Sequence, residues 1–366
     1  MHRNFEYYIG PNHPGIEGNY SIKIEANGDT VLNAEPDFGY LHRAFEKLME
    51  DNLYIQNIAM VPRICVPDPD INEYCYCASI ETLAGEKIPK RAEYIRTLML
   101  ELSRISAYLF YFGGIGGAIG LYTAPQWSFG DRDYLLDLFE DLTGGRVYHI
   151  YMLPGGVRRD LPEGFEEKVL KVMDYLEEQL KRYDDILFHN KIFEKRARGV
   201  GVLKKERAIE LGATGPVLRA CGFKNDVRKD NPYAAYADVE FDIPTADDGD
   251  AYSRIMVRRK EIDESIKIVR QLINNMPKGE YKNQWYNPFK FFVPEGSVYT
   301  KIESSKGEYG YYFVSNGGDK PYRVNVRGAS YTHSITIFKE LVKGARIEDV
   351  ALILFSLDAC PPEVDR

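Results

Sequence analysis

Two cysteine–carboxylate pairs at opposite ends of the chain carry the residue types with the clearest chemistry. Cys65 stands three positions before Asp68, and Cys360 stands three positions before Glu363 in the 366-residue sequence. Cys-x-x-Cys pairs at this spacing hold metals through thiolates. Here each second position is a carboxylate, and two thiols with two hard carboxylates match a nickel–iron centre poorly. We therefore predict that this chain binds no metal.

The remaining cysteines do not supply the missing ligands. The sequence contains five cysteines and no Cys-x-x-Cys: Cys65, Cys75, Cys77, Cys221 and Cys360. A [4Fe–4S] cluster is usually held by about four thiolates. We expect free thiols in a reducing compartment, buried as small apolar residues, and no cofactor bound directly by this chain.

Three further residues are candidates for moving protons. His13 stands between two prolines, which stiffen its loop, so it is either a proton donor or an exposed turn histidine. His42 and Glu46 are four positions apart in a segment predicted to be helical from residue 40, so they would share one face. They are either a proton-carrying pair or part of an ordinary ion-paired face. The neighbouring Arg43 is a candidate donor to a carboxylate or a cluster sulfur.

Composition excludes several classes of function. The chain is 44% hydrophobic and 28% charged, which is typical of a globular protein. Its net charge of −8 argues against nucleic acid as a partner. The sequence has no apolar run of about 18 residues and no signal-peptide pattern at its start. Any association with a membrane is therefore expected to come through a partner.

The elements that must position these residues follow from periodicity and turn signals. Residues 5–40 are predicted to form a small β unit with a hairpin turn at Asn27-Gly28. The apolar spacing predicts helices over 40–50, 90–112, 131–144, 163–190 and 248–276, and strands over 297–303, 311–315 and 322–327. The glycine-rich stretch 113–120 lacks a preceding strand and a Gly-Lys-Ser/Thr, which favours close helix packing over a phosphate loop.

These elements predict an α+β fold, with a central helical bundle and small flanking β elements. We divide the chain into 1–60, the N-terminal β unit and first helix; 61–285, the bundle core; and 286–366, a β/α segment. A rigid turn over 152–162 carries Arg158. The segment 218–230 mixes four cations with two carboxylates, and is either a solvated surface or an internal polar path.

Seven segments in order resemble one known family across nearly the whole chain. They are GPNHPG, GYLHRAFEKL, IPKRAEYIRTLMLELSRI, PGGVRRDLP, LRACGFKNDVRKDNPYAAYADVEFDIP, KGEYGYYFVSNGGDKPYR and EVDR. The chain is similar to the 49-kDa subunit of respiratory complex I and to the large subunit of group 4 membrane-bound [NiFe] hydrogenases. The hydrogenase pattern has four cysteines where this chain keeps only Cys65 and Cys360. The quinone-reducing pattern has a tyrosine in the first loop, where this chain reads Arg63-Ile64-Cys65-Val66.

This intermediate pattern resembles the archaeal branch that reduces sulfane sulfur. The resemblance implies that Cys65 and Cys360 lie together in a pocket with Asp68 and Glu363, where they hold a persulfide or position the substrate. It implies that His13, His42 and Glu46 bring protons and that Arg63 stabilises developing negative charge. Arg43 and Arg158 are expected near a cluster held by a partner. Alternatives are quinone or phenazine reduction, buried relic thiols, and a non-catalytic coupling subunit.

The same resemblance implies a set of partners and a location. Reduced ferredoxin would donate electrons, which would pass through [4Fe–4S] clusters in neighbouring subunits. The expected partners are a [4Fe–4S] small subunit of the complex I PSST type, a 30-kDa-like subunit, a ferredoxin-like two-cluster subunit and membrane-embedded, ion-pumping subunits. The chain itself would be held peripherally on the cytoplasmic side of the cell membrane.

Overall fold

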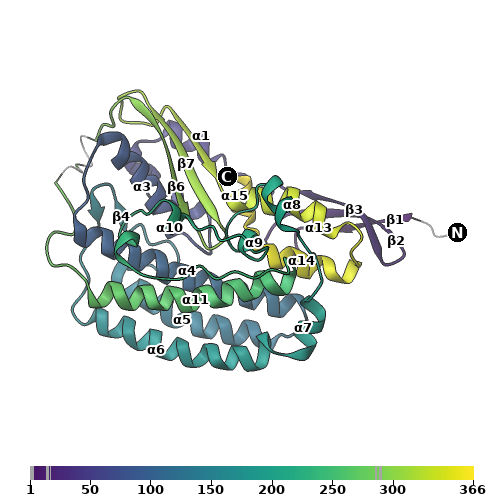
Figure 1. Cartoon of the computed structure of the whole chain (residues 1–366). Helices are drawn as coiled ribbons and strands as arrows, with labels where there is room; N and C mark the ends of the chain where they lie inside the picture. The colour runs from purple at the N-terminus through teal and green to yellow at the C-terminus, as the bar shows by residue number, and fades with distance from the viewer. Residues whose placement is uncertain (1–3, 14–15, 17, 285–286, 288–290) are drawn as a thin grey trace.

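A computed structural model of the chain shows a long helical bundle with two small sheets attached (Figure 1). It describes residues 4–13, 16, 18–284, 287 and 291–366. The long helices α4, α5, α6 and α11 run side by side, and α3 with the strands β6 and β7 covers one end of the bundle. The predicted α+β class, with a helical centre and flanking β elements, is confirmed. The division into three segments stays a prediction.

The helices of the described residues differ widely in length. The α-helices are α1 (Phe45–Asp51), α2 (Tyr54–Asn57), α3 (Asp70–Ala84), α4 (Lys90–Ala118), α5 (Thr123–Thr143), α6 (Phe165–Tyr183), α7 (Lys191–Ala197), α8 (Lys205–Glu210), α9 (Gly215–Arg219), α10 (Val227–Asp230), α11 (Ala251–Asn274), α12 (Ala329–Tyr331), α13 (Phe338–Val342), α14 (Val350–Leu357) and α15 (Pro361–Asp365). Short turns of 3-10 or π geometry are η1 (Val61–Ile64), η2 (Asp184–Phe188), η3 (Tyr236–Asp238), η4 (Thr332–Ile337) and η5 (Ile347–Asp349).

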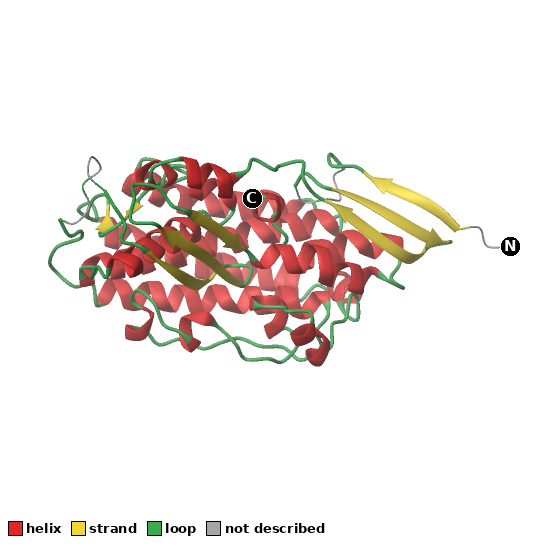
Figure 2. Ribbon diagram, turned by 90° about the horizontal axis from the view of Figure 1, so that it is seen from above, coloured by secondary structure: helices red, strands yellow, loops and turns green. Residues whose placement is uncertain are grey.

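The sheets are antiparallel and small. β1 (Asn4–Ile9), β2 (Ser21–Asn27) and β3 (Thr30–Asp37) form the N-terminal sheet, which projects from one side of the molecule (Figure 2). The second sheet is β6 (Gly296–Glu303), β7 (Glu308–Ser315) and β8 (Arg323–Arg327), and a short hairpin pairs β4 (Met152–Leu153) with β5 (Gly156–Val157). The predicted strands and the Asn27-Gly28 turn are thus present.

The glycine-rich stretch continues α4 rather than forming a loop. A side chain at Gly116 would come within 2.5 Å of the Ala124 Cβ, and one at Gly113 would meet the Phe129 ring at 2.7 Å. Small residues therefore allow α5 to lie directly against α4, as the helix-packing interpretation predicts. The expected helix at 131–144 is longer than predicted, because α5 already begins at Thr123.

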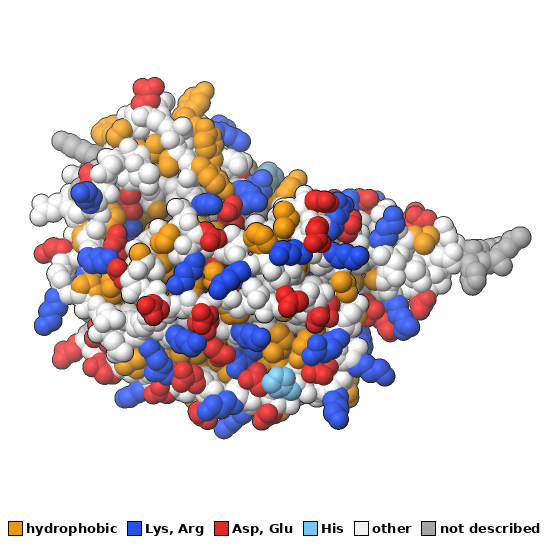
Figure 3. Space-filling view, in the orientation of Figure 1, with side chains coloured by type: hydrophobic (Ala, Val, Ile, Leu, Met, Phe, Trp, Pro, Cys, Tyr) orange, Lys and Arg blue, Asp and Glu red, His pale blue; other side chains and the backbone are white. Residues whose placement is uncertain are grey.

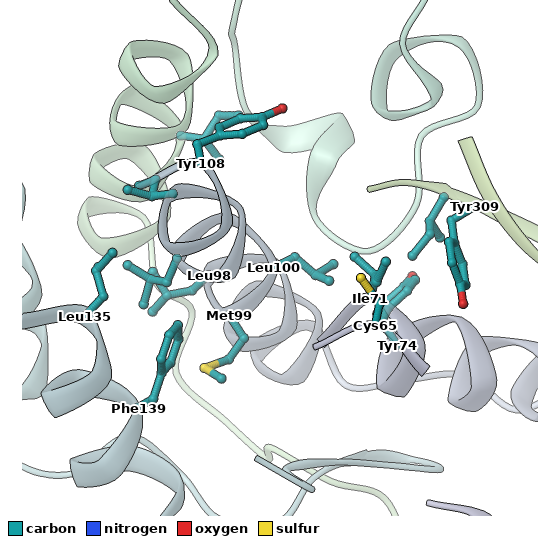
Figure 4. Packing of buried hydrophobic residues seen from close by; sticks show 14 of the residues in the cluster. Cys65, Ile71, Tyr74, Leu98, Met99, Leu100, Tyr108, Leu135, Phe139 and Tyr309 are labelled. Carbon is teal, nitrogen blue, oxygen red and sulfur yellow. The ribbon is translucent and has the colours of Figure 1, made fainter. Parts of the chain in front are cut away.

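One large apolar core fills the bundle, and a second, smaller cluster joins the N-terminal sheet to the helices near the C-terminus. Cys65, Ile71 and Tyr74 belong to the first core together with the buried row of α4 (Figure 4). On the face seen in Figure 3, lysine and arginine side chains alternate with acidic ones over the bundle. No helix in the described residues is long and apolar enough to cross a membrane.

Candidate functional site

The two terminal cysteine segments meet in the interior of the molecule. Cys65 ends η1 and Cys360 precedes α15, and both side chains are buried. One ligand atom from each of Cys65, Cys360 and Glu363 lies within 4.8 Å of the other two. We call these three residues the thiol pocket. The expectation that the two thiols lie together is therefore met by segments from opposite ends of the sequence.

Local backbone chemistry explains how the C-terminal segment enters the pocket. α14 ends at Asp358, which has a left-handed backbone with φ of 57°. Two prolines then open α15, where a missing N–H is tolerated. The Ser330 N–H donates to Glu363 Oε1 at 2.8 Å, and the Cys360 N–H donates to Ser330 Oγ at 3.1 Å. A side chain at Gly328 would lie 2.1 Å from Glu363 Oε1, so glycine leaves the space that the carboxyl occupies.

Lys306 supplies a buried positive charge beside the pocket. It lies in the tight turn between β6 and β7, is 1% exposed, and has its Nζ 3.4 Å from Asp358 Oδ1. Arg258 Nε lies 3.5 Å from the other Asp358 oxygen. Burial opposes the charge on Lys306, but Asp358 and the pocket's acidic groups raise the pKa of Lys306 well above its usual value. The ammonium therefore stays charged next to the thiols.

The thiol pocket holds protons tightly. The hydrogen bond with Cys360 and burial raise the pKa of the Cys65 thiol well above its ordinary value. Burial also raises the pKa of Glu363, against the opposing effect of Lys306. Glu363 Oε2 is buried and has no hydrogen-bond partner among the described residues. The pocket thus offers protonated sulfur and a free carboxyl oxygen rather than an activated thiolate nucleophile.

Two thiols and two carboxylates were expected to lie together. Asp68 is the one of these four residues that lies outside the thiol pocket. Its oxygens accept hydrogen bonds from Ser103 Oγ at 3.2 Å and from the Ser305 N–H at 2.9 Å. Burial raises the pKa of Asp68, while Arg104 and Lys306 oppose that rise. Asp68 therefore anchors the turn that carries Lys306 and does not join the thiols directly.

The expected His42–Glu46 helical pair does not form. Ala44 has φ of 53°, so α1 begins at Phe45 and His42 precedes the helix. His42 Nδ1 instead lies 2.6 Å from the backbone carbonyl of Asp365. Glu46 Oε1 accepts hydrogen bonds from the Val326 N–H, Asn325 and Arg366 instead. Both residues hold the C-terminal helix α15 in place, so the shared-face prediction was wrong.

The other predicted site residues lie at the surface or are partly exposed. His13 is exposed in the loop after β1, and its neighbour Pro14 lies outside the described residues. Arg63 stacks over the Tyr148 ring at 4.9 Å and donates to the Ala59 carbonyl. Arg43 lies over the Phe45 ring at 5.3 Å. Arg158 is exposed and donates to the Thr143 carbonyl. Their proposed roles stay predictions.

A second polar assembly lies next to the pocket and includes part of segment 218–230. Arg219 binds Glu261 and Glu303, each at 2.7 Å, and Arg228 binds Asp226 at 2.6 Å and Glu101 at 3.1 Å. We call the following residues the arginine network: Arg104, Arg219, Arg228, Glu101, Asp226, Glu261 and Glu303, all buried. Segment 218–230 thus combines both alternatives, because Arg219, Asp226 and Arg228 are buried. Lys224, Lys229 and Asp230 are exposed.

The sequence reasoning missed Lys306, Asp358 and most of this network. The sequence identifies the segment containing Lys306 only as part of a family motif, because a lysine in a Ser-Ser-Lys-Gly turn is normally exposed. The tight packing of this turn is visible only in the structure. Gly307 has φ of 140°, and a side chain there would approach Thr214 Oγ1 to 2.5 Å. That turn is therefore packed against α9 rather than projecting into solvent.

The spacing of the pocket atoms would allow Cys65, Cys360 and Glu363 to contact one metal ion. The donor set does not match a nickel–iron centre, which the family resemblance associates with four thiolates. The high thiol pKa further opposes the deprotonation that metal binding requires. The absence of a resident metal stays a prediction.

Comparison with known proteins places the chain in a family. Residues 118–288 and 286–366 match the family described as respiratory-chain NADH dehydrogenase, 49 Kd subunit. The chain belongs to this family. It is 49% identical over 361 residues to a subunit of the NADH-quinone oxidoreductase of Thermosipho melanesiensis, covering 98% of both chains. It is 38% identical to a subunit of the F(420)H(2) dehydrogenase of Methanosarcina mazei, covering 98% of this chain and 97% of the relative.

A solved structure extends the likeness to the branch suggested by the cysteines. The fold matches a chain of the membrane-bound sulfane sulfur reductase, an archaeal respiratory membrane complex, with a TM-score of 0.96. The two are 45% identical, and the match covers 99% of this chain and 98% of the other. The protein is thus a complex I-like oxidoreductase subunit, similar both to quinone-linked relatives and to the sulfur-reducing complex.

Proposed function

We propose that this chain forms the cavity in which a sulfane sulfur, such as a polysulfide, is reduced with electrons that originate from reduced ferredoxin. The observation that carries the proposal is the pair of buried thiols, Cys65 and Cys360, grouped with Glu363 beside the charged Lys306. The 45% identity to a chain of the sulfane sulfur reductase supports the same substrate class.

The residues present suit reductive cleavage of a sulfur–sulfur bond. The net step is R–S–S–R′ + 2e⁻ + 2H⁺ → R–SH + R′–SH, in which one bond breaks and both sulfurs are reduced. Two electrons would reach the substrate from a [4Fe–4S] cluster held by a partner small subunit. Lys306 would stabilise the negative charge that develops on the leaving sulfur. Glu363 and the protonated Cys65 thiol would supply protons.

The proposal also specifies the setting in which the chain works. The chain would pack against a [4Fe–4S] small subunit, with a 30-kDa-like subunit and a ferredoxin-like two-cluster subunit completing the electron path. Membrane-embedded subunits would hold the assembly on the cytoplasmic side of the membrane and use the released energy for ion pumping. The similarity to a chain of a respiratory membrane complex supports this arrangement.

Quinone reduction is the second candidate, because the relative at 49% identity is named as part of a quinone oxidoreductase. Two residues weigh against it. The first loop carries Cys65 and Val66 at the place where the quinone-reducing pattern has a tyrosine. A pocket with two thiols matches sulfur chemistry better than the binding of an aromatic quinone head group, which favours stacking and hydrogen-bonding side chains.

The test uses the assembled complex, reduced ferredoxin and two acceptors supplied separately. With polysulfide, the wild type should release sulfide. A Cys65→Ala/Cys360→Ala double variant should lose about a hundredfold or more in kcat, the usual scale for lost acid–base groups. Cys221→Ala is the matched control, because Cys221 is also buried but donates to the Leu203 and Val217 carbonyls instead.

Two outcomes would contradict the proposal. Undiminished polysulfide reduction in the double variant would remove the thiols from the chemistry and favour a non-catalytic coupling role. Faster turnover with a quinone than with polysulfide in the wild type would favour the second candidate.

A further inference from the structure

A cavity on the far side of the bundle from the thiol pocket combines aromatic side chains with a buried carboxylate. It lies between α5, α6 and the turn η2, has a volume of about 520 Å³, and is lined by aromatic and polar side chains. Its size falls in the range of about 300–1,000 Å³ that is typical of small-molecule sites. Its lining includes Trp127, Asp131, Tyr134, Tyr175, Arg182 and Tyr183.

The centre of this cavity is a buried carboxylate without a cationic partner. Asp131 is 8% exposed, and its Oδ1 accepts a hydrogen bond from the Tyr175 hydroxyl at 2.8 Å. Its Oδ2 accepts one from the Tyr183 hydroxyl. Among the described residues, no lysine, arginine or histidine forms an ion pair with Asp131, although buried carboxylates elsewhere in the chain do so. Burial of such a charge is costly unless an opposite charge accompanies it.

Aromatic rings surround the same carboxylate. Tyr134 and Tyr175 lie with their ring centroids 4.6 Å apart and their planes inclined by 54°. Trp127 lines the opening and is 41% exposed, and Tyr134 is 46% exposed, so both rings are accessible to a ligand. Because aromatic faces attract cations, rings arranged about a carboxylate favour a ligand that carries a positive charge on an apolar body.

Burial and the hydrogen bond to Asp131 raise the pKa of both Tyr175 and Tyr183. Both hydroxyls therefore keep their protons and continue to donate to Asp131. Arg182 also lines the cavity, but its Nη1 donates to Gln179 Oε1 at 3.3 Å. It lies too far from Asp131 to form an ion pair with it, so the carboxylate's charge stays available to a ligand.

We propose that this cavity binds a small organic ammonium, with the charged nitrogen against Asp131 and its alkyl groups against Trp127, Tyr134 and Tyr175. The site is independent of the thiol pocket and of the proposed reduction. Primary polyamines and quaternary ammonium compounds share the required chemistry, and the binding measurements distinguish them.

Calorimetric titration of the full chain with choline, with spermidine and with 3,3-dimethylbutan-1-ol tests the proposal. The alcohol is the uncharged isostere of choline, so a site for cations should bind choline at least about fivefold more tightly, the scale of one cation–π contact. Tighter binding of choline than of spermidine would identify a quaternary ammonium site, and the reverse order a polyamine site. Binding of the alcohol as tight as that of the better-bound cation, or binding of none of the probes, would overturn the proposal.

Variants locate the binding within the cavity. Asp131→Asn keeps the shape and should lower affinity about tenfold or more, whereas Trp127→Leu at the exposed rim should lower it about three- to tenfold. Asp133→Asn is the matched control on the same helix, because Asp133 pairs with Arg146 at the surface. Unchanged affinity in Trp127→Leu, which tolerates the exposed substitution even if Asp131→Asn misfolds, would exclude this cavity. Binding to the isolated chain but not to the assembled complex would show that a partner's side chain fills the site instead.

Discussion

The arginine network and the thiol pocket are both buried and are connected by the turn between β6 and β7, yet their charges are balanced differently. In the network, each carboxylate accepts a hydrogen bond from an arginine or a neighbouring group, and Arg219 and Arg228 each bridge two acids. In the pocket, Glu363 Oε2 has no hydrogen-bond partner among the described residues. A paired network holds elements together, whereas an unpaired acceptor beside two thiols is suited to a substrate or a proton.

The pKa values divide the buried acids in a different way. Burial and repulsion from Asp226 raise the pKa of Glu303 to about 7, while the arginines oppose that rise. For Asp226, burial is overcome by Arg228 and Arg219, and the pKa falls well below its usual range. In the pocket no arginine contacts Glu363 among the described residues, and burial prevails. Contact with a guanidinium group alone therefore does not keep a buried acid ionised, because Glu303 contacts Arg219 and still has a raised pKa. The balance of burial, nearby arginines and neighbouring acids decides the outcome.

The largest effect is expected from breaking the network. Arg228→Met removes the nearest cation of both Asp226 and Glu101. Among the described residues, Asp226 then keeps only Arg219 at 3.7 Å, and Glu101 keeps only Arg104 at 3.3 Å. The variant should lower the free energy of unfolding by about 3–5 kcal/mol. Denaturant unfolding of the full chain measures this. The control is Arg207→Met, whose exposed pairs with Glu340 and Glu210 should contribute little to the free energy of unfolding. Equal losses in the two variants would show that the network does not stabilise the fold.

In the thiol pocket, by contrast, removing a charge is expected to raise the free energy of unfolding at high pH. Because the pKa of Glu363 is raised in the folded state, the folded chain holds this proton more tightly than the unfolded chain, and wild-type stability falls as pH rises above about 4.5 through the folded pKa. The Glu363→Gln variant does not lose stability in this way, because a glutamine side chain does not ionise. The variant should match the wild type near pH 5 and exceed it by on the order of 1 kcal/mol at pH 8, while polysulfide reduction by the complex declines.

Unfolding curves between pH 5 and pH 8 check this prediction, with the exposed Glu167→Gln as the control. A Glu363→Gln variant that is less stable than the wild type at every pH would mean that the carboxylate serves as a structural partner of Lys306. Glu363 would then be a paired structural acid, as the carboxylates of the arginine network are.

Much of the scaffold could be predicted from local patterns, because these depend on neighbouring residues. The apolar repeat from Ile95 to Leu109 predicted the middle of α4, and Asn27-Gly28 predicted the turn between β2 and β3. The predicted start of a helix was wrong where one residue has an unusual backbone conformation. Ala44 in the left-handed region delays α1, and that single residue separates His42 from the helix that carries Glu46.

The candidate site was predictable only as far as family motifs identified its residues. Cys65, Cys360 and Glu363 are found by their spacing and their place in the motifs. Lys306 and Asp358 are not, because their burial results from packing among β7, α9 and α14 rather than from any local pattern. The opposite error occurred for Asp68, whose spacing suggested a ligand position although its oxygens bind Ser103 and Ser305.

The smallest effect is expected from metal removal, and it sharpens the distinction between a proton-holding pocket and a metal site. If the Cys65 thiol is protonated as its raised pKa implies, a chelator removes nothing from the native chain, and the melting temperature should change by less than about 1 °C. Elemental analysis should then find no stoichiometric nickel or zinc. A chelator-induced drop in melting temperature that Cys65→Ala abolishes would instead assign a metal to Cys65, Cys360 and Glu363. The three atoms within 4.8 Å would then be its ligands rather than proton donors to a sulfur substrate.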